Sequence, residues 1–140
     1  MIDCVILGDS IAVGIHQQRT ECAVYAKSGI NTWQFNSRFP GEFFSDYVII
    51  SLGSNDHRGI KTLDELTKLR RRIMANKKVI WILPAGNNEN SGVDIKKIQS
   101  LVMLVAKSNN DIVIPITNLS ADKIHPSSKG YQDLSRSFPR

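Results

Sequence analysis

Five short apolar runs, separated by segments with helical signals, constrain the fold of this chain more than any other feature. The runs lie near residues 3–7, 22–26, 46–52, 78–83 and 111–115 and are rich in Val, Ile, Tyr or Trp, which favour β-strands. Most are continuously apolar, as is typical of strands covered on both faces. Strands alternating with helices predict a parallel sheet with helices on both faces. We expect an α/β, flavodoxin-like arrangement of five strands in the order 2-1-3-4-5.

Helical signals lie between these runs. Apolar residues recur at helical spacing over residues 63–73, and Thr62 with Glu65 three positions later predicts a capping box at the start of this helix. A second helix is expected around residues 95–105. Shorter helices are expected from Ser10 to about Gln17, after Asn31, and from Ser127 to about Arg136. Gly14, in the first of these, would let that helix pack closely on its neighbours.

The size and composition indicate an ordinary globular protein. A chain of 140 residues fits one domain, residues 1–140, and is too short for a separate substrate-binding lobe, so specificity must come from loops. With 41% hydrophobic and 22% charged residues and no apolar stretch long enough to span a bilayer, we expect a water-soluble chain with no membrane partner. The first residues lack the pattern of a signal peptide, so a cytoplasmic location is expected, and release by cell lysis stays open.

The cysteines and histidines give no sign of a metal. Cys4 and Cys22 fall in predicted core strands, and we interpret them as reduced, structural residues, with a disulfide or a reactive thiol as the alternatives. His16, His57 and His125 lie far apart and have no ligand-type spacing with cysteine or acid. We expect neither a metal nor a cofactor.

The formal net charge of +5 favours anionic partners such as nucleic acid or cell wall. The basic residues concentrate at Lys68, Arg70, Arg71, Arg72, Lys77, Lys78, Lys96 and Lys97. Consecutive helix residues diverge by about 100°, so the three arginines would fan out rather than form one stripe. A solvated face is the simpler interpretation, with nonspecific attraction to anionic surfaces as the alternative. No recognition motif accompanies the charge, so we expect no specific nucleic-acid binding.

Residues suited to nucleophilic catalysis lie at the two ends of the chain. Gly8-Asp9-Ser10 closes the first apolar run, and Asp122 and His125 precede the last expected helix. A serine hydroxyl becomes a good nucleophile only when a base accepts its proton, and an acid three residues before His125 could orient that base. Each segment also has a simpler explanation, since Asp9 or Ser10 could cap a helix and the Asp-x-x-His-Pro segment could be a helix N-terminus.

Three further groups could stabilise negative charge on a reacting carbonyl. The backbone N–H of Ser10, the N–H of Gly29 and the side-chain amide of Asn55 each follow a different expected strand. Because the carboxyl ends of parallel strands share one edge of the sheet, we expect these groups to converge. Taken singly, Gly29 and Asn55 could equally be turn residues.

Together these segments resemble the SGNH hydrolases, also called the GDSL esterase/lipase family. The matching segments are Gly8-Asp9-Ser10 with Gly14, Gly29, Gly53-Ser54-Asn55-Asp56, and Asp122-Lys123-Ile124-His125-Pro126. They span nearly the whole chain in family order. The resemblance implies a three-layer α/β/α sandwich in which Ser10 is the nucleophile, His125 the base and Asp122 the orienting acid. It also implies that Gly29 and Asn55 donate to the oxyanion.

The chain departs from the family in two respects. Ile11 stands where many members have leucine, a change that should preserve packing. The chain is also short for the family, so we expect trimmed loops and an open, shallow crevice. Trp33, His57 and Arg58 could line that crevice, or could be packing and loop residues, whereas Phe35 is expected in the core. His57 is the rival base, but Asp56 directly beside it is poorly spaced to orient it.

These observations predict a serine hydrolase that cleaves short acyl esters through an acyl-enzyme, with O-acetyl groups on carbohydrate as the expected substrate. The expected partner is therefore a small-molecule or glycan ester. One alternative is a hydrolase directed at cell-wall peptidoglycan, such as a phage lysis enzyme. Another is a binding module of the same fold that holds a glycan or an anion without turnover.

Overall fold

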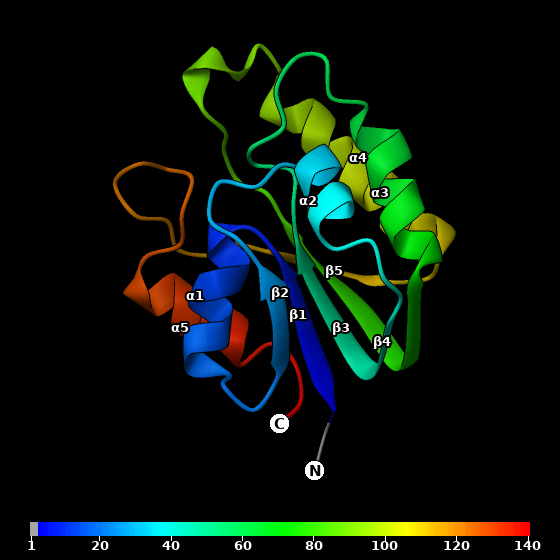
Figure 1. Ribbon diagram of the computed structural model, residues 1–140. Helices are drawn as coiled ribbons and strands as arrows, with labels where there is room; N and C mark the ends of the chain where they lie inside the picture. The colour runs from blue at the N-terminus through cyan, green and yellow to red at the C-terminus, as the bar shows by residue number, and fades with distance from the viewer. Residues whose placement is uncertain (1–2) are drawn as a thin grey trace.

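The computed structural model describes residues 3–140, which form a five-stranded parallel sheet between two layers of helices (Figure 1). In chain order the elements are β1 (Cys4–Gly8), α1 (Ser10–Gln18), β2 (Ala23–Ala26), α2 (Thr32–Arg38), β3 (Phe43–Ser51), α3 (Thr62–Arg71), β4 (Ile73–Leu83), the 3-10 turn η1 (Glu89–Ser91), α4 (Ile95–Ser108), β5 (Ile112–Pro115) and α5 (Ser128–Ser135). The strand order is β2-β1-β3-β4-β5 and every pairing is parallel. The predicted three-layer α/β/α fold and its strand order are confirmed.

Each face of the sheet has its own hydrophobic core. On one face, Ile6 and Ile49 pack with residues of α1 and α5, and on the other, Leu7 and Ile50 pack with residues of α2, α3 and α4. Phe35 is fully buried in the second core, as expected. Because successive strand residues enter opposite cores, the central strands must be apolar at every position, which explains their continuous apolar runs.

The helices on the first face approach each other closely at a glycine. A Cβ atom added at Gly14 of α1 would lie 2.3 Å from the Tyr131 ring of α5. Only glycine leaves room for that ring, so the expected close packing at Gly14 is confirmed.

The start of β4 and the cap of α3 differ from the sequence prediction. The helix expected over residues 63–73 ends at Arg71, and β4 begins at Ile73 because Ile73 pairs with Phe43 of an early-starting β3. The predicted capping box is wrong. Thr62 donates its hydroxyl to the buried carboxylate of Asp56 instead, and no side chain caps the helix at its N-cap residue.

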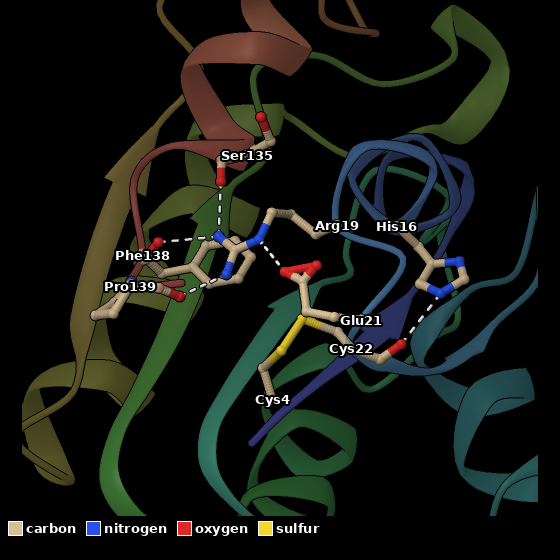
Figure 2. Close-up of a disulfide and its surroundings, with 8 residues drawn as sticks. All are labelled: Cys4, His16, Arg19, Glu21, Cys22, Ser135, Phe138 and Pro139. Atoms are coloured by element: carbon tan, nitrogen blue, oxygen red, sulfur yellow. Dashed lines mark hydrogen bonds and ion pairs between the residues drawn. A yellow bond between two sulfur atoms is a disulfide. The ribbon is translucent and has the colours of Figure 1, made fainter. Parts of the chain in front are cut away.

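Cys4 and Cys22 form a disulfide, so the expectation of reduced cysteines is wrong (Figure 2). Cys4 opens β1 and Cys22 immediately precedes β2. Their sequence neighbours Val5 and Ala23 are register partners in the adjacent parallel strands. This register places the two Cα atoms 4.7 Å apart, within bonding range for a disulfide. The predicted strand order already makes the two strands neighbours, but only the register brings the two cysteines together.

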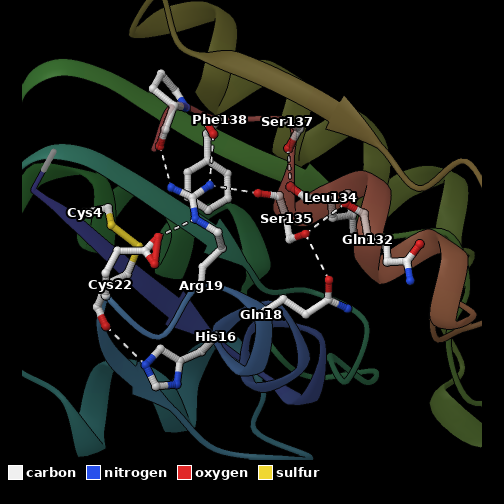
Figure 3. A network of polar contacts seen from close by, with 12 residues as sticks. Cys4, His16, Gln18, Arg19, Cys22, Gln132, Leu134, Ser135, Ser137 and Phe138 are labelled. Carbon is white, nitrogen blue, oxygen red and sulfur yellow. Dashed lines mark hydrogen bonds and ion pairs between the residues drawn. A yellow bond between two sulfur atoms is a disulfide. The ribbon is translucent and has the colours of Figure 1, made fainter. Parts of the chain in front are cut away.

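The fully buried guanidinium of Arg19 holds the C-terminal tail beside this disulfide (Figure 3). It donates to the backbone carbonyls of Ser135, Phe138 and Pro139 and to the carboxylate of Glu21. It also lies over the Phe138 ring, 4.0 Å from the ring centroid. These charge-assisted contacts hold the end of α5 at Ser135 and the tail after it, which has no helix or strand of its own.

Two arginines of the basic segment bind other residues of this chain through their side chains. Arg70 makes a bidentate contact with Asp111, which also accepts from the Trp81 indole. Arg72 donates to Asn36 and to the carbonyls of Phe39 and Gly41. These contacts confirm that the arginines do not form one exposed stripe. Among the described residues, no helix has the length and apolar character needed to cross a membrane.

Candidate active site

Ser10 lies at the first position of α1, on a sharp turn that only glycine permits. The Gly8 backbone has φ +142°, and an added Cβ would lie 1.9 Å from the Ser51 carbonyl oxygen. Asp9 then caps α1 by accepting from the Ile11 N–H at 3.0 Å. At the first turn of a helix the backbone N–H groups have no intrahelical acceptor, so the Ser10 N–H is at the positive end of the helix dipole without a partner inside the helix.

The His125 ring lies between Ser10 and Asp122. Ser10 Oγ is 2.9 Å from His125 Nε2, although the two residues are 115 positions apart in sequence. His125 Nδ1 is 2.6 Å from Asp122 Oδ2. A carboxylate can only accept, so Nδ1 carries the proton and Nε2 is left to accept from the serine hydroxyl. The structure thus brings the three predicted catalytic residues into one hydrogen-bonded line.

A tight loop holds the Asp122 carboxylate in place. Its Oδ1 atom accepts from the Ser120 hydroxyl and from the backbone N–H groups of Ile124 and His125. The hydrogen bond from His125 is the main reason that the pKa of Asp122 lies well below its usual value, and the two N–H groups and Ser120 lower the pKa further. Asp122 therefore stays ionised wherever His125 can act as a base. The side chains of His125 and Asp122 are 41% and 46% exposed, so this part of the site is open to solvent.

The two other predicted oxyanion donors lie on the turns that follow β2 and β3. Gly29 has φ +80°, a left-handed conformation, and no atom would lie within 4 Å of an added Cβ. Asn55 Nδ2 donates to the carbonyl of Ile30 at 3.0 Å, which ties the two turns together. An amide nitrogen carries two N–H bonds, so the second remains for a ligand.

A buried carboxylate that the sequence analysis did not single out for this role secures both turns. Asp56 is 0% exposed and accepts from the Thr32 N–H, the Thr32 hydroxyl and the Thr62 hydroxyl. Thr32 and Thr62 are the first residues of α2 and α3, so one carboxylate joins the N-termini of both helices to the turn that carries Asn55. No residue pattern in the sequence indicates that these two threonines meet.

The remaining predicted residues, Trp33, His57 and Arg58, are exposed. Trp33 is 54% exposed on α2. His57 is exposed, and its Nδ1 atom contacts the Arg58 carbonyl at 2.8 Å rather than a carboxylate. Because the Asp56 carboxylate is buried and occupied by threonines, it does not orient His57. The rival base therefore lacks an acid partner, whereas His125 has one.

Asp9 has a strongly perturbed carboxyl group directly beside Ser10. Burial raises its pKa from 3.8 to about 6, against the opposing effect of donors from Ile11 and Ser51. Its Oδ2 atom is buried without a hydrogen-bond partner in the described part of the chain. Burial also raises the pKa of Tyr131, which is further raised by the charges of Asp9 and Asp122.

One cluster within residues 3–140 has the composition of a metal site but not its chemistry. Ligand atoms of Cys4, Glu21 and Cys22 lie within 4.8 Å of one another. The two sulfur atoms are bonded to each other, so neither is a thiolate that could bind a metal.

Fold and site together define an α/β protein with a Ser-His-Asp arrangement at the carboxyl edge of a parallel sheet. Among solved structures, a GDSL-like lipase from Bacteroides thetaiotaomicron is similar at 20% identity and a TM-score of 0.69, over 95% of this chain and 83% of that one. An acetyl xylan esterase is similar at 17% identity and a TM-score of 0.64, over 96% of each chain. The C-terminal catalytic domain of peptidoglycan O-acetyltransferase A from Streptococcus pneumoniae is similar at 16% identity and a TM-score of 0.64, over 94% and 89%.

No protein-family model matches the sequence, and no curated protein matches it. The fold of this chain is that of the GDSL, or SGNH, hydrolases. This is the fold that the sequence resemblance implies.

Proposed function

We propose that this chain is an SGNH-type serine esterase in which Ser10 is the nucleophile, His125 the base and Asp122 the orienting acid. The observation that carries the proposal is the pair of contacts made by His125, 2.9 Å from Nε2 to Ser10 Oγ and 2.6 Å from Nδ1 to Asp122 Oδ2. A histidine that bridges a serine and a carboxylate in this way is the arrangement that activates serine in hydrolases.

In the acylation step, Ser10 Oγ attacks the ester carbonyl carbon while His125 Nε2 takes the hydroxyl proton. The carbonyl oxygen becomes negative and accepts from the Ser10 N–H, the Gly29 N–H and the Asn55 amide. The bond to the alcohol oxygen then breaks, and the imidazolium returns the proton to the leaving alcohol. The ionised Asp122 stabilises the imidazolium without taking its proton.

Deacylation repeats these steps with water as the nucleophile. His125 Nε2 removes a proton from water, and the hydroxide attacks the acyl carbon. The same donors hold the second oxyanion, and the proton passes to Ser10 Oγ as the carboxylic acid leaves. The open position of His125, whose side chain is 41% exposed, gives water access to the acyl-enzyme.

Short acyl esters, in particular O-acetyl groups on carbohydrate, are the proposed substrates. An acetyl xylan esterase and a peptidoglycan O-acetyltransferase domain share the fold, and both names refer to acetyl groups on polysaccharide. The exposed His125–Asp122 loop also leaves room for a bulky alcohol. A narrower form of this proposal is that the acetylated carbohydrate is cell-wall peptidoglycan, as it would be for a lysis enzyme.

Hydrolysis of p-nitrophenyl esters from acetate to long chains tests the activity. Ser10→Ala and His125→Ala should each lower kcat/KM on the acetate by at least about 10³-fold, because each removes a member of the triad. His57→Ala is the matched histidine control and should lose far less than His125→Ala. If wild type releases no more product than Ser10→Ala, a binding module without turnover replaces the esterase.

The disulfide bears on where such an esterase would work. Disulfides persist in oxidising compartments and are rare in the cytosol, so the Cys4–Cys22 bond favours a protein that acts outside the cytosol. This differs from the cytoplasmic location expected from the sequence. Release by cell lysis would deliver the chain to such a compartment.

A further inference from the structure

A cavity of about 450 Å³ opens directly beside the proposed oxyanion donors. Gly29 and Asn55 lie on its wall with Ser54, and the loop after β4 contributes Asn88, Asn90 and Ser91. The cavity is within the size range of small-molecule sites. A group bound in it would therefore sit next to the ester carbonyl held at Ser10.

The described wall of this cavity consists of amide, hydroxyl and imidazole side chains and contains no carboxylate, lysine or arginine. Amides and hydroxyls both donate and accept, which suits a ligand whose groups do the same. Sugar hydroxyls have this property, whereas an acyl chain would leave the amides without partners.

Asn90 supplies an unpaired group on this wall. The residue is exposed, and its side-chain amide makes no hydrogen bond within the described part of the chain. An amide both donates and accepts, so a sugar hydroxyl bound in the cavity can pair with it.

We propose that this cavity is a sugar subsite, which binds an uncharged, hydroxyl-rich ring of the glycan that carries the acyl group. The proposal rests on the esterase function and narrows its substrate to acylated carbohydrate. The sugar hydroxyls pair with the amides of the 88–91 loop while the ester carbonyl lies at Gly29 and Asn55.

His57 lies on the wall of this cavity and on the wall of a second one of about 600 Å³. The second cavity combines the side chains of Arg58, Lys61 and Lys97 with apolar residues such as Leu101. A glycan that extends past His57 would reach the second cavity, so an oligosaccharide is the ligand to test.

The experiment compares kcat/KM on an O-acetylated xylo-oligosaccharide with kcat/KM on p-nitrophenyl acetate, which contains no sugar. Asn90→Ala removes an exposed amide whose side chain makes no hydrogen bond with the described protein, and Asn90→Leu keeps the size of that side chain without its donors and acceptor. Each should lower the ratio of oligosaccharide to p-nitrophenyl acetate kcat/KM by about three- to tenfold, the range for one hydrogen bond. Thermal unfolding confirms that both variants fold.

Gln17→Ala, an exposed amide at the far end of α1, is the matched control and should leave the ratio at the wild-type value. A ratio in both cavity variants equal to that of Gln17→Ala overturns the subsite. So does a shift in the preference between p-nitrophenyl acetate and butyrate with no change in the ratio, because the cavity would then hold the acyl chain. Wild type that hydrolyses neither substrate refutes the esterase, and with it the subsite.

Discussion

At the scale of single residues, the fold opposes the ionisation of Asp9. Its carboxyl is buried, and its pKa is raised from 3.8 to about 6. The folded state therefore binds a proton more tightly than the unfolded state does. Stability from this group is fully present below pH 3.8 and is lost as the pH rises through about 6.

Asp9→Asn tests this linkage, because asparagine keeps an oxygen for Ile11 and Ser51 and removes the charge. The stability of the variant relative to wild type should be about 2 kcal/mol higher at pH 7.5 than at pH 4, because each pKa unit is worth about 1.4 kcal/mol and the unfolded-state carboxyl is already partly ionised at pH 4. Urea denaturation of both proteins at the two pH values measures the difference. If the stability difference between the variant and wild type is the same at both pH values, the fold does not raise the pKa of Asp9.

The three residues of the proposed triad could be predicted from the sequence. Ser10 directly follows an expected strand, and His125 precedes an expected helix, with Asp122 three positions before it. Their residue types and order predict the chemistry. Asp56 could not be assigned in the same way. Its three hydrogen bonds come from Thr32 and Thr62, whose neighbourhood arises only when α2 and α3 pack side by side.

At the scale of elements, Asp56 joins the starts of α2 and α3 to the turn that carries Asn55. Thr62→Val removes one hydroxyl from a buried carboxylate while keeping the side-chain shape, and should lower the free energy of unfolding by about 1.5–3 kcal/mol. We also expect the loss in kcat to exceed the rise in KM, because Asn55 is a proposed donor to the developing oxyanion. Chemical denaturation and steady-state kinetics on p-nitrophenyl acetate measure both effects.

Thr62→Ser is the control for this prediction, since it retains the hydroxyl that Asp56 accepts from. It should stay near wild type in kcat and recover most of the stability. Equal loss in the serine and valine variants would mean that the methyl group, and not the hydrogen bond, holds α3 in place.

The same region explains why some element boundaries escaped prediction. Periodicity alone extended α3 to Ile73, but Ile73 pairs with Phe43 in the sheet. Thr62 and Glu65 have the spacing of a capping box, but Thr62 donates to Asp56, and Glu65 accepts from Asn36 of α2. In each case a contact with a residue distant in sequence replaces the local helical interaction that the pattern predicts.

At the scale of the whole molecule, the disulfide and the contacts of Arg19 lie at the end of the sheet opposite the candidate active site, where they connect the start of β1, the start of β2 and the C-terminal tail. The Cys4–Cys22 bond spans 18 residues and encloses the turn with Ser10. A double Cys4→Ala/Cys22→Ala variant should lose about 3 kcal/mol of unfolding free energy, because the unfolded chain is no longer constrained. Urea denaturation with and without dithiothreitol measures this loss.

Wild type should lose a similar amount when reduced, and the double variant should be insensitive to dithiothreitol. An oxidised wild type no more stable than the double variant would contradict a stabilising role for the bond. The tail contacts of Arg19 are present in both proteins, so they do not account for the difference.

By itself the sequence determined the α/β class, the strand order, the buried position of Phe35 and the residue types that form the proposed triad. These follow from local periodicity, from the rule that parallel strands end at one edge, and from a family resemblance carried by short segments. Only the tertiary structure decided the Cys4–Cys22 bond, the carboxylate bridge at Asp56 and the amide-lined cavity. Each depends on side chains from separate elements meeting at distances of a few ångströms, and such meetings are set by packing and register rather than by any local pattern.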